Sequence, residues 1–110
     1  MPSESELQQQ IRIALGTEPG LVLWRNSVGV ADVGGRVQRF GLCKGSADLI
    51  GILDGRFVAL EVKTERGRVS PEQQLFLDLV RRRGGFAAVV RSIDDARAAV
   101  TRARSKEHHQ

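Results

Sequence analysis

The sequence is short of the features that mark several classes of protein. Cys43 is its only cysteine, so no internal disulfide can form, and we expect a buried thiol in a reducing, cytoplasmic setting. No apolar run approaches the roughly 20 residues that cross a bilayer, so no contact with a membrane is expected. The first residues lack a basic stretch followed by an apolar one, so no signal peptide is predicted.

A basic excess is what the composition does offer. The 110 residues include 17 Lys and Arg against 13 Asp and Glu, which gives a net charge of +4. Arginine makes up most of this excess, and its planar fork matches phosphate oxygens, so a polyanionic partner is indicated. The apolar fraction of 41% and the absence of repeats or linkers indicate one globular domain.

Apolar periodicity and turn residues predict an alternation of helices and strands. The expected helices cover 3–15, 71–83 and 93–104, and the expected strands cover 21–26, 47–53, 56–64 and 86–90, with a glycine-rich hairpin over 28–40. The buried face of the second helix is expected to contain Leu75, Phe76, Leu79 and Val80. This order predicts an α/β fold with a central mixed β-sheet flanked by helices, in which 56–64 and 86–90 form a right-handed parallel pair. Residues 1–104 would form the domain, and residues 105–110 a disordered polar tail.

The dipeptide Asp-Gly at 54–55, between two apolar runs, is the clearest local signal. A two-residue hairpin loop there places Asp48 directly opposite Glu61, with their Cβ atoms roughly 4.5–5.5 Å apart. Because the side chains of a strand alternate between its two faces, Lys63 lies on the same face as Glu61. A β-bulge near Asp48 would shift this register by one residue.

Two carboxylates that face each other among apolar residues are costly. Their repulsion and their burial should raise the pKa of at least one, unless a cation lies between them. A divalent metal resolves the conflict, and Lys63 can then hold a nucleophilic water or a phosphate oxygen. On a basic protein, such a group suits hydrolysis of a phosphodiester bond. The alternative is that Asp48, Glu61 and Lys63 are half-exposed strand residues that form a salt bridge.

Several segments carry a family resemblance through their order and spacing. They are 45–49 (Gly-Ser-Ala-Asp-Leu), 61–64 (Glu-Val-Lys-Thr), 68–73 (Arg-Val-Ser-Pro-Glu-Gln), Phe76, 84–85 and 89–91, preceded by Glu4, Leu7, Gln8 and 24–26. Together they resemble the VRR-NUC branch of the PD-(D/E)XK nuclease superfamily, a group that includes stand-alone phage and bacterial proteins. Ala47 departs from the motif, which has proline there for backbone shape. The resemblance extends to about Arg104 and implies a restriction-endonuclease-like core of order α-β-β-β-α-β-α.

The resemblance also implies an activity and a site. Such a protein would be a DNA endonuclease that uses Mg²⁺ or Mn²⁺, selects branched or four-way junction DNA as Holliday-junction resolvases do, and works as a homodimer. Lys63 would orient the water or stabilise charge, and Gln73 would lie near the active site. The metal would be bound by Glu4, Asp48, Glu61 and the backbone carbonyl of Val62.

Two of these assignments leave alternatives open. Glu4 continues the inward stripe of the first helix, but Glu6 lies in the same turn, and both can simply compensate the helix dipole. Gln73 can be the capping-box partner of Ser70, either alone or together with a role in the site.

Polar residues near the glycine-rich loops are the predicted DNA contacts, because glycine lets the backbone approach phosphates that arginine then holds. They are Arg25, Asn26, Arg36, Arg39, Lys44 and Arg68. A solvated surface is the alternative for each of them. The alternative for the whole protein is a non-catalytic nucleic-acid-binding module, although such a module has no use for facing acids that weaken DNA binding.

Overall fold

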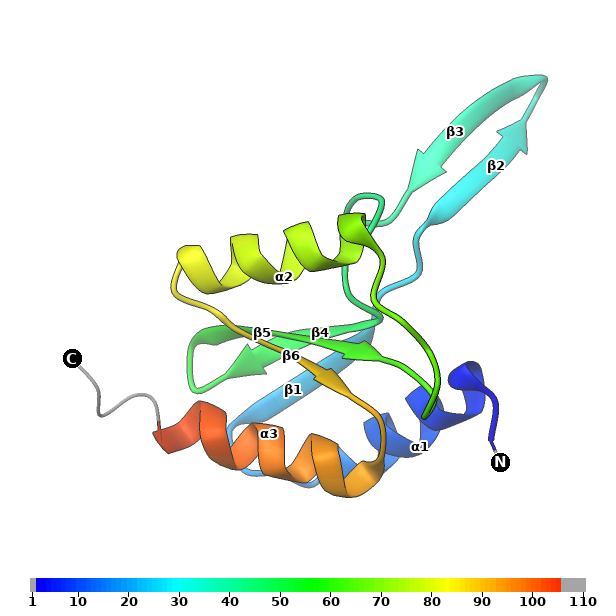
Figure 1. The fold of residues 1–110 in the computed structure, drawn as a ribbon. Coiled ribbons are helices and arrows are strands. Elements are labelled where there is room, and N and C mark those ends of the chain that lie inside the picture. Colours follow the sequence, from blue (N-terminus) through cyan, green and yellow to red (C-terminus); the bar gives the residue numbers. More distant parts are fainter. Residues whose placement is uncertain (1, 106–110) are drawn as a thin grey trace.

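The helices and strands follow the order that the sequence predicts (Figure 1). The structure, a computed structural model, describes residues 2–105. Its elements are α1 (Glu4–Leu15), β1 (Leu21–Arg25), β2 (Gly29–Val33), β3 (Arg36–Phe40), β4 (Leu49–Leu53), β5 (Arg56–Val62), α2 (Pro71–Arg82), β6 (Phe86–Val90) and α3 (Ile93–Ser105). None of the helices in this part of the chain has the length and apolar character that a bilayer crossing requires.

Only the first residue of the predicted tail, Ser105, belongs to the described residues. Ser105 is the last residue of α3 instead of the first residue of the tail, because the helix continues one residue beyond the expected end. The remainder of that prediction falls on residues 106–110, which lie outside the described residues.

The central sheet is mixed, as predicted, and its strand order is β1-β4-β5-β6. β1 pairs with β4 and β4 with β5 in antiparallel fashion, whereas β5 and β6 are parallel and connected through α2. Asp54 and Gly55 form the turn between β4 and β5, with φ angles of 49° and 85° that suit a tight hairpin turn. The register therefore pairs Leu49 with Leu60, and no bulge interrupts the ladder.

Helices cover the two faces of this sheet (Figure 1). α1 and α3 contact each other on one face, and their buried side chains form a large core with those of the strands, which includes Ile11, Leu15, Leu49, Leu53 and Val100. α2 lies on the other face against β5 and β6, where a smaller core contains Ala47, Ala59, Leu77, Val80 and Ala87.

Capping boxes fix where α1 and α2 begin. Ser3 and Ser70 are the N-caps, and each hydroxyl accepts a hydrogen bond from the backbone N–H three residues later. In return, the side chains of Glu6 and Gln73 accept hydrogen bonds from the N–H groups of the two caps.

Two predictions about burial are wrong. Leu75 and Leu79 are 66% and 42% exposed, and Leu77 is buried in their place. The helix turns Leu77 and Val80 toward the sheet because α2 packs chiefly on β5 and β6, which leaves its flank without a partner element. Cys43, which was expected to be buried, lies exposed in the connection between β3 and β4.

β2 and β3 form the predicted hairpin, a two-stranded sheet that projects from the body (Figure 1). Gly34 and Gly35 make its turn at φ angles of 60° and 82°. The ring of Phe40 lies over its cross-strand partner Gly29, where a Cβ would come within 2.7 Å of the ring. Residues 30–40 are exposed on both faces, so the hairpin has no core of its own.

Candidate active site

Three acidic side chains meet where β5 ends and β4 begins. Glu4 comes from the first turn of α1, Asp48 directly precedes β4, and Glu61 lies near the end of β5. One carboxylate oxygen of each residue lies within 4.8 Å of the other two. The register of β4 and β5, continued by one residue, sets Asp48 opposite Glu61, as the turn predicts. Such an acidic cluster could hold a metal ion.

Hydrogen bonds to two neighbouring segments hold Asp48 in place. Its Oδ2 accepts a hydrogen bond from the backbone N–H of Val62 at 2.9 Å, and its carbonyl accepts one from the N–H of Asn26 at 2.7 Å. The side-chain amide of Asn26 donates to Ser46 Oγ at 2.8 Å and to the carbonyl of Ala47 at 2.9 Å. These two hydrogen bonds therefore hold the backbone of Ser46 and Ala47, directly before Asp48, against the end of β1.

Glu61 is the most deeply buried acid of the cluster, with 1% of its surface exposed. Its Oε2 accepts a hydrogen bond from Nε2 of Gln73 at 3.0 Å and lies 3.6 Å from Nζ of Lys63. Its Oε1 is buried and has no hydrogen-bond partner among the described residues. Burial above all, and then the charge of Asp48, raise the pKa of Glu61 to about 8, although the charge of Lys63 acts in the opposite direction.

Lys63 is the second buried charge, with 8% exposure. Its backbone N–H donates to the carbonyl of Val90 at 3.1 Å, so the pairing of β5 with β6 fixes the position of its Cα. The ion pair with Glu61 is the salt bridge that the sequence offered as an alternative, but it is buried instead of half-exposed. It also leaves the second oxygen of Glu61 without a partner, which a purely structural salt bridge does not explain.

The structure separates the two glutamates of the first helical turn. Glu4 lies in the acidic cluster. Glu6 is exposed, and its carboxylate accepts the hydrogen bond from the N–H of Ser3, which lowers the pKa of Glu6. Gln73 combines the two roles that the sequence left open, since Oε1 completes the capping box with Ser70 while Nε2 donates to Glu61.

The predicted DNA contacts divide into two groups. Asn26 is half-buried, and its amide donates to protein atoms, so its position serves Asp48. The register of β1 and β4, continued by one residue, sets Asn26 opposite Asp48, but this pairing is non-local and gave no signal in the sequence. The basic side chains remain on the exposed surface, with Lys44 3.7 Å from Glu72, and the others are Arg25, Arg36, Arg39 and Arg68.

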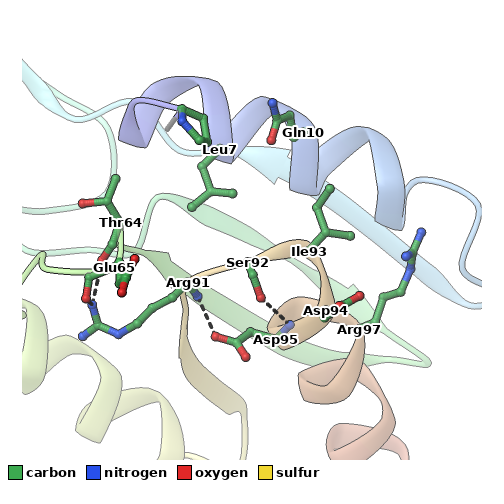
Figure 2. A pocket seen from close by; sticks show the side chains of 11 residues that line it. Leu7, Gln10, Thr64, Glu65, Arg91, Ser92, Ile93, Asp94, Asp95 and Arg97 are labelled. Carbon is green, nitrogen blue, oxygen red and sulfur yellow. Dashed lines mark hydrogen bonds between the residues drawn. The ribbon is translucent and has the colours of Figure 1, made fainter.

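Arg91 is a residue to which the sequence assigned no role. Its Nη1 donates to the carbonyls of Thr64 at 2.8 Å and Gly67 at 2.7 Å, so the end of β6 holds the loop that follows Lys63. Figure 2 shows its guanidinium beside Thr64, at a pocket of about 590 Å³ between α1, this loop and the start of α3. The three acids do not line this pocket. The sequence signals for Arg91 were its place directly after a predicted strand and its membership of segment 89–91, which contributes to the family resemblance.

The model of the VRR-NUC domain family matches residues 3–94, which include the acidic cluster, Lys63 and Gln73. A search among curated proteins finds no match.

Proposed function

Since the chain belongs to the VRR-NUC domain family, we propose that it is a metal-dependent endonuclease that hydrolyses DNA phosphodiester bonds at the cluster of Glu4, Asp48 and Glu61. The family implies a nuclease that acts on DNA. Residues 1–104 would form this nuclease domain, of the PD-(D/E)XK superfamily and the stand-alone phage or bacterial type, in the cytoplasm of a bacterial or phage-infected cell.

The observation that carries the proposal is the unpartnered Oε1 of Glu61. A buried carboxylate oxygen without a hydrogen bond costs free energy, and such groups are rare in folded proteins. Asp48 and Glu4 supply two more carboxylate oxygens within 4.8 Å, so the donors are all of the hard oxygen type. Mg²⁺ and Mn²⁺ favour such oxygen donors, so the residues present fit either ion.

Four groups would hold the ion, namely one carboxylate oxygen each from Glu4, Asp48 and Glu61 and the backbone carbonyl of Val62. A bound divalent ion supplies a Lewis acid that lowers the pKa of a water ligand and neutralises charge on a phosphate. The N–H of Val62 and the amide of Gln73 each occupy one oxygen of an acid, so they orient Asp48 and Glu61 before any ligand binds.

Lys63 would act on the reacting groups directly. Its ammonium group has three donors, and the structure places it 3.6 Å from Oε2 of Glu61 in a nearly dry environment. A lysine in this position would orient the attacking water and stabilise the charge that develops on the phosphate oxygens. Because Glu61 keeps it at the site, no reorganisation is needed when the substrate arrives.

The exposed basic residues would bind the DNA backbone. Arg25 ends the strand that leads into the hairpin, Arg36 and Arg39 lie on β3, and Lys44 and Arg68 flank the cluster in the sequence. Such contacts are independent of base sequence and weaken as the salt concentration rises. We assign Asn26 to the positioning of Asp48 instead of DNA contact, because its amide already donates to protein atoms. Selectivity for branched DNA is part of the same proposal.

A cleavage assay tests this function. Linear duplex, single-stranded, flap and four-way junction DNA are incubated with Mg²⁺ or Mn²⁺ and with wild type, Asp48→Asn, Lys63→Ala or the control Glu65→Gln. Glu65 is an exposed acid in the loop after Lys63, outside the cluster. We expect cutting by wild type and the control only, with the junction or flap preferred. DNA binding without cutting by any of the four proteins would instead identify a non-catalytic module.

A further inference from the structure

A pocket of about 590 Å³ lies directly beside the acidic cluster, and none of its residues takes part in the proposed hydrolysis (Figure 2). α1 supplies Glu4 to the cluster and Leu7, one turn later, to the pocket. The segment after β5 supplies Lys63 to the site and the next residue, Thr64, to the pocket. One helical turn rises about 5.4 Å, and consecutive Cα atoms are about 3.8 Å apart. Since stacked nucleotides of one strand are about 3.4 Å apart, the pocket begins within about one or two nucleotides of a phosphate at the cluster.

The floor of this pocket is apolar. Leu7 belongs to the large core, and Ile93 is half-buried against the same core. Figure 2 shows both side chains pointing into the space between α1 and α3. A volume of about 300–1,000 Å³, an apolar lining and a few polar groups are typical of sites that bind a small organic group. The pocket therefore has the size and the floor of such a site.

The charged groups around the floor do not suit a phosphate. The lining contains more acids than bases, namely Glu65, Asp94 and Asp95 against Arg91 and Arg97. Nη1 of Arg91 already donates to the carbonyls of Thr64 and Gly67. The N–H of Asp95 donates to Ser92 Oγ at 3.0 Å, so the start of α3 is capped from within the chain. A lining with net negative charge repels a phosphate and suits a neutral group that has N–H donors.

A nucleobase matches both the floor and the charge of the pocket. It is flat and neutral, and it carries its donors and acceptors at its edges. Enzymes that bind an unstacked base place it between apolar or aromatic side chains and read its edge by hydrogen bonds. Gln10 of α1 and Asp94 of α3 line the pocket from two different elements and offer an amide and a carboxylate. We assign the base edge to Asp94, since Oδ2 of Asp95 already accepts a hydrogen bond from the N–H of Arg91.

The carboxylate of Asp94 distinguishes between bases. Cytosine and adenine present an amino group that a carboxylate can accept, whereas thymine presents the acceptor O4 at the corresponding place. Glu65 lies at the boundary of the pocket, because Pro2, Thr64 and Glu65 also line a neighbouring hollow. That hollow contains Arg66, which suits the phosphate of a nucleotide whose base lies in the pocket.

We propose that this pocket, which we call the base pocket, binds one unpaired nucleobase that carries an amino group, next to the phosphate at the acidic cluster. The inference rests on the proposed function, because a DNA strand at the cluster is what brings a base to this place. A base inside a duplex must first be unstacked and unpaired, which costs free energy, whereas a base in a single strand or at a branch is already accessible. The base pocket therefore favours DNA that offers an unpaired base beside the phosphate.

Binding of two short single strands, one all cytosine and one all thymine, to the full chain tests the base pocket. The affinities are measured by fluorescence anisotropy in EDTA, so no cutting is needed. The two strands have equal numbers of phosphates, so contacts to the backbone contribute equally. We expect wild type to bind the cytosine strand about 5-fold more tightly or better, and Asp94→Ala to bind both strands equally. Asp78→Ala is the control, since it removes the same charge from the surface of α2 and should keep the preference.

A fluorescent base provides a second readout. 2-Aminopurine carries an amino group, and stacking on neighbouring bases quenches its fluorescence. A single 2-aminopurine in a thymine strand should enter the base pocket of wild type, where the aliphatic floor does not quench it, and its emission should rise several-fold. Gln10→Trp fills the base pocket and should abolish this rise. Gln9→Trp is the matched control, because Gln9 is exposed on the same helix and does not line the pocket.

The outcomes separate the base pocket from the nuclease. Equal binding of the two strands by wild type, or tighter binding of thymine, overturns the base pocket. A rise in 2-aminopurine emission that persists in Gln10→Trp also overturns it, because the base then lies elsewhere. A protein that shows the expected preference and emission but cuts no DNA upholds the base pocket and contradicts the proposed hydrolysis. A protein that cuts DNA without either signal contradicts the base pocket alone.

Discussion

Replacement of Gln73 by methionine separates the two roles of this side chain. Gln73 accepts a hydrogen bond from the N–H of Ser70 at 2.8 Å and donates one to Oε2 of Glu61 at 3.0 Å. Methionine has a similar length but can make neither bond. Ser70→Ala is the matched control, since it removes the hydroxyl that caps the helix and leaves the amide of Gln73 able to donate to Glu61.

The two substitutions should differ in free energy and in metal affinity. Loss of a helix cap costs about 1 kcal/mol, so Ser70→Ala should lower the free energy of unfolding by about that amount. Gln73→Met also leaves Oε2 of the buried Glu61 with Lys63 alone, and a buried acceptor that loses its donor adds about 1–3 kcal/mol. Since Gln73 orients an acid of the proposed metal site, its loss should weaken Mn²⁺ binding by about 10- to 100-fold.

Urea denaturation in EDTA and calorimetric titration with Mn²⁺ measure the two quantities on the same samples. We expect both variants to be less stable than wild type, and only Gln73→Met to lose Mn²⁺ affinity. Equal losses of Mn²⁺ affinity in the two variants would refute this reasoning, because they would show that Gln73 acts only through the position of α2.

Three further predictions follow from the same contacts. Glu4→Gln should weaken Mn²⁺ binding several-fold, while Glu6→Gln, whose amide oxygen can still accept from the cap N–H, should leave it unchanged in a calorimetric titration. Asn26→Ala should lower the free energy of unfolding by about 1–3 kcal/mol in urea denaturation, because two partly buried acceptors lose their donor. The pKa of Glu61 is raised from 4.5 to about 8, so between those pH values the folded, metal-free protein keeps a proton that the unfolded chain has released, and its stability should fall as pH rises. Glu61→Gln should flatten this fall when thermal melts in EDTA are compared at pH 5 and pH 9.

The part of the site that rests on local structure could be predicted from the sequence. Asp48 and Glu61 belong to adjacent strands joined by a two-residue turn, and the Asp-Gly pair alone fixes their register. The start of α2 was equally local, because the capping box lies within four residues.

Features that depend on distant pairing could not be predicted. Asn26 reaches Asp48 because β1 pairs with β4 across the whole hairpin insertion, and no turn between them sets that register. The parallel pairing of β5 and β6 was predicted but its register was not, and this register is what brings Arg91 to the loop after Lys63. In both cases the partner lies more than 20 residues away, where periodicity carries no information.

The buried face of α2 shows a different limit of prediction from the sequence. Leu75, Leu77 and Leu79 are all apolar, so the pattern of residues does not decide which of them faces the sheet. The structure buries Leu77 and exposes the other two, because α2 covers only part of the sheet.

The most direct test of the metal site is a calorimetric titration of Mn²⁺ into wild type, Glu61→Gln and the control Glu65→Gln, in the absence of DNA. The account predicts saturable binding to wild type and to Glu65→Gln, and loss of that binding in Glu61→Gln, because the substitution removes the buried oxygen that has no partner. Equal Mn²⁺ affinity in all three proteins, or no binding to wild type, would contradict the claim that this cluster holds a metal ion.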